Sequence, residues 1–79
     1  MNLKKNLSIT GSSNVSWKDA IVKTIEEASK TITKLSEVRI IEQRAQISGD
    51  KLTTYVVELE LSFDIDITTN SSTNAVNSN

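Results

Sequence analysis

The stretch from Thr54 to Asp66 constrains the fold more than any other part of the chain. Its odd-numbered positions from Tyr55 to Ile65 are all apolar, whereas its even-numbered positions from Glu58 onward are all polar. This period of two is typical of a strand that buries one face. The polar face carries Glu58, Glu60, Ser62, Asp64 and Asp66. The rest of the chain must therefore supply a core for the apolar face.

Composition limits both the size of that core and the chemistry available. A chain of 79 residues forms one small domain, which buries only roughly 60% of the surface of its unfolded chain. It has no cysteine and no histidine, so disulfides, thiolate nucleophiles, imidazole bases and the usual zinc sites are excluded. Nine basic and ten acidic residues disfavour nucleic-acid backbone binding. Association is the remaining means of gaining stability.

The range Trp17–Leu35 has the apolar spacing of a helix. Its apolar stripe contains Trp17, Ala20, Ile21, Thr24, Ile25, Ala28, Thr31, Ile32 and Leu35. This spacing predicts an amphipathic helix of about five turns. Ser16 is a suitable N-cap, because its hydroxyl can accept a hydrogen bond from the backbone amide of Asp19. Val15, just before the cap, is placed to pack on Ala20.

The N-terminal part of the chain predicts a first strand over Leu3–Thr10, because apolar and polar residues alternate there. Gly11–Asn14 is rich in turn-forming residues and predicts the connection to the helix. At the other end, residues 68–79 are almost entirely polar and predict a disordered C-terminal tail. We therefore divide the chain into a folded domain over residues 1–67 and this tail.

The range Glu37–Ser48 predicts a second strand. Its apolar phase slips between Ile40 and Ile41, which indicates either a β-bulge or a strand that is partly covered on both faces. Gly49, followed by Asp50, predicts a tight hairpin turn in which the glycine takes a positive φ.

The order of elements is strand, helix, strand, strand, which predicts an α+β fold. The simplest sheet places the last strand between the other two, antiparallel to both, in the order 1-3-2 with a right-handed crossover. The last strand would span about 46 Å, whereas the predicted helix spans only about 28 Å. We expect the sheet to curl around the helix. Its overhanging end, including Phe63 and Ile65, should pack on neighbouring subunits.

Five segments stand in an order and spacing that is typical of one family: Lys4–Lys5, Thr10–Ser13, Ala28–Ile32, Val38–Arg44 and Tyr55–Phe63. In these segments the chain resembles the dodecins. The resemblance covers residues 3–66. It implies a β-α-β-β chain whose three-stranded sheet partly wraps one helix, and a hollow homododecamer. It also implies a binding protein rather than an enzyme, which holds riboflavin or FMN in pairs between subunits. Some members of the family bind coenzyme A.

The positions that contact flavin in this family differ here. The tryptophan on which the flavin ring stacks corresponds to Glu37, and the glutamine that bonds the flavin edge corresponds to Val56. A basic residue of some relatives corresponds to Asp64. Arg44 matches a position that approaches the phosphate or ring, and is the predicted cofactor-binding residue. We expect Trp17 to be a core residue of the helix and not a replacement for the missing aromatic ring.

Two functional hypotheses remain open. In the first, a dodecin-like shell binds flavin with weakened contacts. In the second, the assembly binds no flavin, and is either structural or binds another ligand such as calcium, for which the acidic strand face offers carboxylate oxygens. The ordinary alternative for that face is a solvated surface. Glu58 and Glu60 could form a paired-carboxylate site, but no pocket is evident around them, so catalysis is disfavoured. The absence of a long apolar run predicts a cytoplasmic protein without a membrane anchor.

Overall fold

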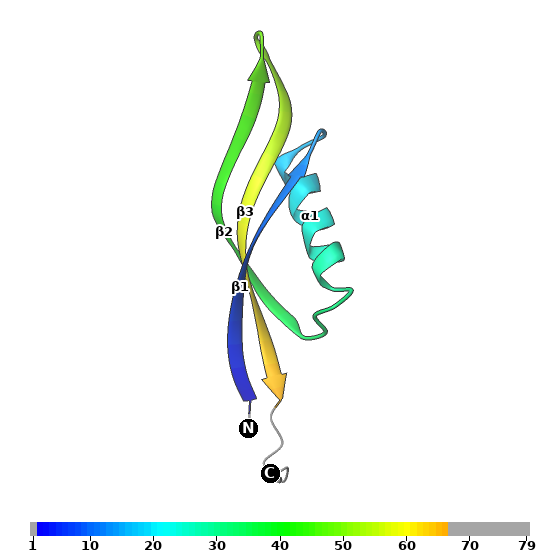
Figure 1. Cartoon of the computed structure of the whole chain (residues 1–79), viewed down its shortest axis with the longest axis vertical. Coiled ribbons are helices and arrows are strands. Elements are labelled where there is room, and N and C mark those ends of the chain that lie inside the picture. The colour runs from blue at the N-terminus through cyan, green and yellow to red at the C-terminus, as the bar shows by residue number, and fades with distance from the viewer. Residues whose placement is uncertain (1, 67–79) are drawn as a thin grey trace, which may run out of the picture.

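The computed structural model describes residues 2–66. These residues form β1 (Asn2–Ser13), α1 (Trp17–Ala28), β2 (Leu35–Ser48) and β3 (Lys51–Asp66) (Figure 1). The strands form one antiparallel sheet in the order β1-β3-β2, with the long closing strand in the centre. The predicted α+β class and strand order are therefore confirmed. The predicted tail, residues 68–79, lies outside the described residues.

The core lies between α1 and the β1–β3 half of the sheet. Ala20 of α1 and Val57 and Leu59 of β3 are fully buried against one another. Ile9 and Ile21 pack around this cluster and are partly buried. The apolar face of β3 thus finds its cover in α1, as the alternation in the sequence predicts.

The sequence prediction of a turn at Gly11–Asn14 is wrong, because β1 continues through Ser13 and pairs with β3 up to Tyr55. Gly11 lies opposite Val57 in this pairing. A Cβ atom added at Gly11 would collide with the Oγ1 atom of buried Thr24 in α1. Gly11 leaves room for the Thr24 side chain of α1, so its place in the strand reflects close packing and not a turn of the chain.

The start of α1 follows the predicted capping pattern. The Asp19 amide donates a hydrogen bond of 2.9 Å to the Ser16 hydroxyl. The Asp19 carboxylate in turn accepts a hydrogen bond of 2.6 Å from the Ser13 hydroxyl and forms an ion pair of 3.2 Å with Lys23. These two partners, the serine first, lower the pKa of Asp19 below its ordinary value. The predicted packing of Val15 on Ala20 is wrong, since Val15 remains 70% exposed.

The predicted end of α1 at Leu35 is also wrong, because the helix ends at Ala28 and Ser29 is its C-cap. Thr31 and Ile32 continue the apolar spacing, but β-branched residues favour helix only weakly. The Thr31 and Ile32 amides close the last turn by donating to the Ala28 carbonyl. The chain then descends to Leu35, which starts β2 opposite Phe63. Within residues 2–66, no helix is long and apolar enough to cross a membrane.

The β2–β3 hairpin confirms two details predicted from the sequence. The register shifts between Ile40 and Glu42, so Ile41 has no partner on β3 and forms an irregularity of the β-bulge type. Gly49 in the turn has a φ of 66°, a conformation that glycine adopts at little cost. β2 is otherwise almost entirely exposed, since only Leu35 and Ala45 are partly buried.

The molecule is long and thin. Its extents are 61 × 17 × 15 Å and its radius of gyration is 17.8 Å, whereas a compact domain of this length has a radius of about 12 Å. The exposed surface is 5384 Å², against roughly 4,700 Å² for a compact protein of this mass. Figure 1 shows the reason, because the β2–β3 hairpin and the N-terminal half of β1 extend beyond the two ends of α1. The sheet therefore extends beyond α1, as predicted. Phe63 and Ile65, which were expected at the uncovered end, are instead partly buried near Ile32, and the more exposed end is the β2–β3 hairpin with Ile47 and Leu52.

Candidate functional site

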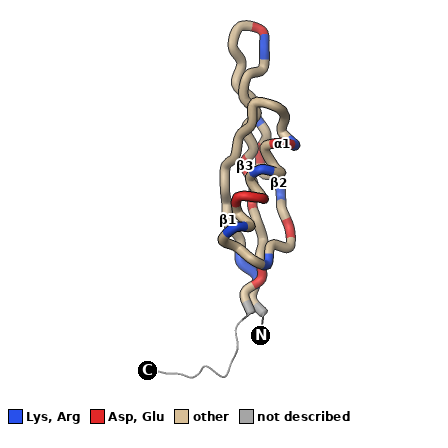
Figure 2. The backbone as a smooth tube through the Cα atoms, turned by 90° about the vertical axis from the view of Figure 1, so that its right-hand side faces the viewer, with Lys and Arg blue, Asp and Glu red and all other residues tan. Residues whose placement is uncertain are grey.

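The face of the sheet opposite α1 carries paired polar side chains. Two charged rows run across it. In one, the Arg39 guanidinium lies 2.9 Å from Glu60, and in the other the Lys4 ammonium lies 3.4 Å from Asp64. Figure 2 shows acidic and basic segments on the strands and on α1. Most of this surface is therefore a neutralised, solvated sheet face, which is the ordinary alternative to the acidic metal site.

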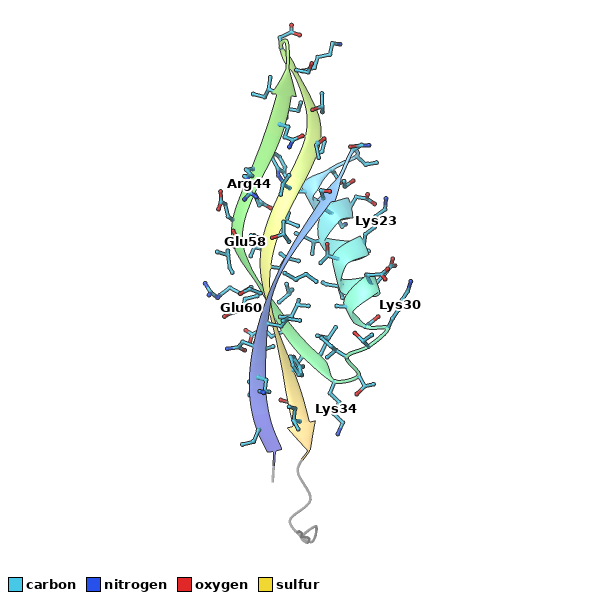
Figure 3. The ribbon with its side chains drawn as sticks, in the orientation of Figure 1. Lys23, Lys30, Lys34, Arg44, Glu58 and Glu60 are labelled. Atoms are coloured by element: carbon cyan, nitrogen blue, oxygen red, sulfur yellow. The ribbon has the colours of Figure 1, made fainter. Side chains whose placement is uncertain are left out.

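One row departs from this pattern. Glu58 of β3 lies directly opposite Glu42 of β2 and, on its other side, opposite Thr10 of β1. Like charges in this arrangement repel each other. Arg44 offsets only part of this charge, since its Nη1 atom lies 3.5 Å from Glu42, and no ion pair involves Glu58 within residues 2–66. Figure 3 shows Arg44, Glu58 and Glu60 along the β2–β3 part of the sheet, whereas Lys23 of α1 and Lys30 and Lys34, which follow α1, lie toward the other side.

These carboxylates do not form a closed metal site in one subunit. Within the described residues, no group of three or more acidic, histidine or cysteine side chains is arranged to hold a metal ion. Calcium takes six to eight oxygen ligands, and Glu42 with Glu58 can supply at most four. A cation at this row would require further ligands from water or from a second chain.

Arg44 lies in a polar groove of about 390 Å³ on the same face of the sheet. Val56 is its cross-strand partner, so these two sequence-predicted positions are brought together. The groove is lined by Thr10, Gly11, Ser12, Arg44, Ala45, Gln46, Thr54 and Val56. It contains hydroxyls, one amide and one guanidinium but no carboxylate, so it is suited to an anionic or hydroxyl-rich group.

Trp17 binds the backbone of Arg44 from the side of the sheet opposite this groove. Its Nε1–H donates a hydrogen bond of 3.0 Å to the Arg44 carbonyl. Its ring meets Tyr55 edge to face, with ring centroids 5.0 Å apart and an interplanar angle of 77°. The expected core role of Trp17 is confirmed, because the residue also packs on the buried cluster of Ala20, Val57 and Leu59. Its ring is therefore not available as a stacking surface.

The other two positions carried over from the family lie elsewhere. Glu37 pairs with Ser62, and Asp64 binds Lys4 in the lower half of the sheet. Val56 and Ser62 are six residues apart on β3, which corresponds to about 20 Å. The predicted ligand positions thus form two separate groups in one subunit.

Beside α1 there is a second, more apolar depression of about 240 Å³. It is lined by Ile25, Leu35, Ser36, Glu37, Val38 and Leu61. It exists because α1 packs on β1 and β3 and makes few contacts with β2. We call this depression the trough. Glu37 borders it at the position where the family resemblance places the stacking tryptophan, but Glu37 lies opposite Ser62, so its carboxylate is on the sheet face away from α1.

Sequence reasoning missed the opposition of Glu42 and Glu58. The phase slip at Ile40 and Ile41 is the sequence feature that indicates it. A bulge at this point puts Glu42 on the same face as Glu58. The sequence does not place Ser12 in the groove, because it predicts a turn at Gly11–Asn14 where β1 continues.

Comparison with known proteins identifies the family. The family model described as Dodecin matches residues 4–66. The calcium dodecin of Mycobacterium tuberculosis is 30% identical over 63 residues, which cover 80% of this chain and 89% of that protein. The chain belongs to the dodecin family, as the sequence resemblance predicts.

Solved structures agree with this assignment. A variant of the Thermus thermophilus dodecin has a TM-score of 0.80 at 26% identity, covering 86% of this chain and all of that one. The calcium dodecin of M. tuberculosis has a TM-score of 0.69 at 31% identity, covering 77% and 87% of the two chains. Its structure is described as that of a calcium-chelating antigen with a novel calcium-binding site. A dodecin from Streptomyces davaonensis shares the fold, with a TM-score of 0.78 at 24% identity.

Proposed function

We propose that this chain is the subunit of a self-assembling binding protein, a dodecin-type homododecamer that performs no catalysis. The observation that carries the proposal is the incomplete cover of the sheet. Val38 and Ile40 of β2 remain 36% and 47% exposed, although they lie opposite the buried Leu61 and Leu59. A second copy of the chain is the partner that family membership favours.

Native mass spectrometry tests this proposal. We expect a dominant species of about 104 kDa, twelve times the chain mass of 8.7 kDa. A species of 8.7 kDa that retains its secondary structure by circular dichroism would contradict it.

Flavin does not fit the residues of this chain in the stacked manner of the family. The chain has three aromatic side chains. Trp17 and Tyr55 pack on each other, and Phe63 is partly buried in a pocket with Ile32 and Ile65. Glu37 offers no ring at the stacking position and would repel an FMN phosphate. We propose that the assembly does not hold stacked riboflavin or FMN.

Quenching of riboflavin fluorescence tests this part of the proposal. Loss of a stacking face costs roughly 1–3 kcal/mol per ring, about tenfold to a hundredfold or more in affinity. We expect no quenching at micromolar riboflavin and a gain of quenching in a Glu37→Trp variant. Quenching by the unaltered protein at micromolar flavin would contradict the proposal. Coenzyme A, which the family resemblance also suggests, can be tested directly by calorimetric titration of the unaltered protein.

A second candidate function is calcium binding at the row of Glu42 and Glu58. The specific observation is the opposition of these two carboxylates, which Arg44 offsets only in part, and the relative named calcium dodecin supports it. A divalent cation would relieve the repulsion between them, and a neighbouring subunit or water would complete the oxygen ligands.

Thermal unfolding with added salts tests the calcium proposal. Millimolar calcium should raise the Tm of the unaltered protein, while sodium chloride of equal ionic strength should not. Glu58→Gln should abolish this rise, whereas Glu26→Gln on α1 should keep it. Equal stabilisation by the two salts, or a rise that survives in Glu58→Gln, would exclude this site.

A further inference from the structure

The groove beside Arg44 has the side chains of an anion site. It lies on the sheet face away from α1, because Val56 in its lining alternates with Val57, which is buried against α1. Val56 is only 9% exposed and is the apolar part of the lining. The polar groups around it come from Thr10, Ser12, Arg44, Gln46 and Thr54. A volume of about 390 Å³ is within the usual range of small-molecule sites.

Arg44 has a partner outside this groove. Its Nη1 atom lies 3.5 Å from Oε2 of Glu42, which does not line the groove. Arg44 and Glu42 are two positions apart on β2, and their partners Val56 and Glu58 are two positions apart on β3, so both side chains lie on the same face. The side chains are 51% and 52% exposed. An ion pair as exposed as this one is weak enough to exchange partners.

The neighbouring charges draw Arg44 toward Glu42. Glu58 lies directly opposite Glu42, and the two carboxylates repel each other. Arg39 is engaged with Glu60 at 2.9 Å, so within residues 2–66 Arg44 is the cation that pairs with this row. Figure 3 shows Arg44 on the hairpin side of Glu58. The guanidinium therefore lies between two acidic residues on one side and a groove without acidic side chains on the other.

From these contacts we infer that Glu42 restrains Arg44 and thereby sets the affinity of the groove for a phosphate-bearing, hydroxyl-rich small molecule. In the restrained state the guanidinium pairs with Glu42. In the bound state it donates to the phosphate oxygens, while Ser12, Thr54 and Gln46 bond the hydroxyls of the ligand. The family resemblance suggests Arg44 as a ligand contact, and control of that contact by Glu42 goes beyond it.

The restraint also connects the groove to the proposed calcium row. A calcium ion bound by Glu42 and Glu58 competes with Arg44 for Glu42 and releases the guanidinium to the groove. Calcium should therefore strengthen phosphate binding, and the phosphate compound should strengthen calcium binding by the same factor. This consequence rests on the proposed calcium function, whereas the restraint itself does not.

Calorimetric titration with ribose 5-phosphate in calcium-free buffer tests the restraint, with ribose as the uncharged control. Glu42→Gln should bind ribose 5-phosphate about two- to fivefold more tightly than the unaltered protein, the change expected when one exposed ion pair is lost. Glu58→Gln is the matched control, because it removes the same charge from the row but leaves the ion pair. It should gain less than half as much. Arg44→Gln should bind at least tenfold more weakly, and ribose should bind no variant detectably.

The gain must also depend on Arg44. The double variant carrying Glu42→Gln and Arg44→Gln should bind no more tightly than Arg44→Gln alone. A gain that persists in this double variant, or equal gains in Glu42→Gln and Glu58→Gln, would mean that the carboxylates only repel the anion, and would overturn the restraint. Absence of binding by Glu42→Gln at millimolar ribose 5-phosphate would overturn the assignment of the groove.

A second titration in millimolar calcium separates the inference from the proposed calcium function. Calcium should raise the affinity of the unaltered protein for ribose 5-phosphate and should not raise that of Glu42→Gln. If calcium raises the Tm but not this affinity, Glu42 does not act on Arg44 and the restraint is wrong. If calcium changes neither quantity, the calcium function fails, and the calcium-free titrations still decide whether Glu42 restrains Arg44.

Discussion

The two halves of the sheet are built from similar residues but differ in their cover. Leu59 and Ile40 lie directly opposite each other on β3 and β2, yet Leu59 is fully buried and Ile40 is 47% exposed. The difference arises because α1 packs over β1 and β3 and leaves β2 at the side. An aliphatic residue at a core-facing position is thus not by itself evidence of a core within the same chain.

The largest effects should come from substituting this pair. Leu59→Ala should lower the free energy of unfolding by about 2–5 kcal/mol, by the same amount at every protein concentration, because its cover comes from its own chain. Ile40→Ala should lower the free energy of unfolding of the dissociated chain only slightly and should lower the stability of the assembly more. Chemical denaturation at several protein concentrations measures both. If Ile40→Ala loses as much stability as Leu59→Ala, and by the same amount at every concentration, the two halves of the sheet do not differ in the source of their cover.

A smaller effect is expected where α1 approaches β1. Gly11→Ala should destabilise the fold by about 1–3 kcal/mol, because the added Cβ would meet Thr24. The double variant that carries both Gly11→Ala and Thr24→Ala lacks the obstructing hydroxyl, so it should recover part of the lost stability. The matched change Gly49→Ala leaves packing unaffected, since that site has free space, and tests only the positive φ. Thermal unfolding compares the three variants, and full stability in Gly11→Ala would show that α1 does not pack this closely.

The helix cap contributes less. Ser16→Ala should cost about 0.5–2 kcal/mol, because the Asp19 amide loses its acceptor. Ser29→Ala at the other end of α1 is the control, since within residues 2–66 the exposed hydroxyl of Ser29 bonds only the Glu26 carbonyl. Equal losses in the two variants, by urea denaturation, would contradict the cap assignment.

The smallest effect concerns pH. The pKa of Asp19 is lowered from 3.8 by the Ser13 hydroxyl and then by Lys23. A lowered folded-state pKa stabilises the fold above pH 3.8, and this contribution is lost as the pH falls through the folded value. Ser13→Ala and Asp19→Asn should both flatten the acid dependence of the Tm. An unchanged acid slope in both variants would show that this carboxylate does not contribute.

Local sequence signals predicted the parts of the fold that depend on nearby residues. The alternation of β3, the cap at Ser16, the bulge after Ile40 and the positive φ of Gly49 all follow from side chains within a few positions. The end of α1 and the length of β1 could not be read in this way. They depend on where Thr24 meets Gly11 and where Leu35 must start β2, which are contacts between segments distant in the sequence.

The candidate site was predictable only in part. Arg44 was named from family resemblance and does lie in a groove beside Val56, while its role in binding remains a prediction. The row of Glu42 and Glu58 depends on the register across the bulge, and the trough depends on the position of α1 over the sheet. Neither is visible in one strand considered alone.

The central claim is that the chain completes its core only with copies of itself, and the concentration dependence of thermal unfolding tests it most directly. For a subunit whose stability includes assembly, the Tm must rise with total protein concentration. We expect a rise of several degrees between low-micromolar and high-micromolar protein. A Tm that stays constant over this range, with a native mass of 8.7 kDa, would contradict the account.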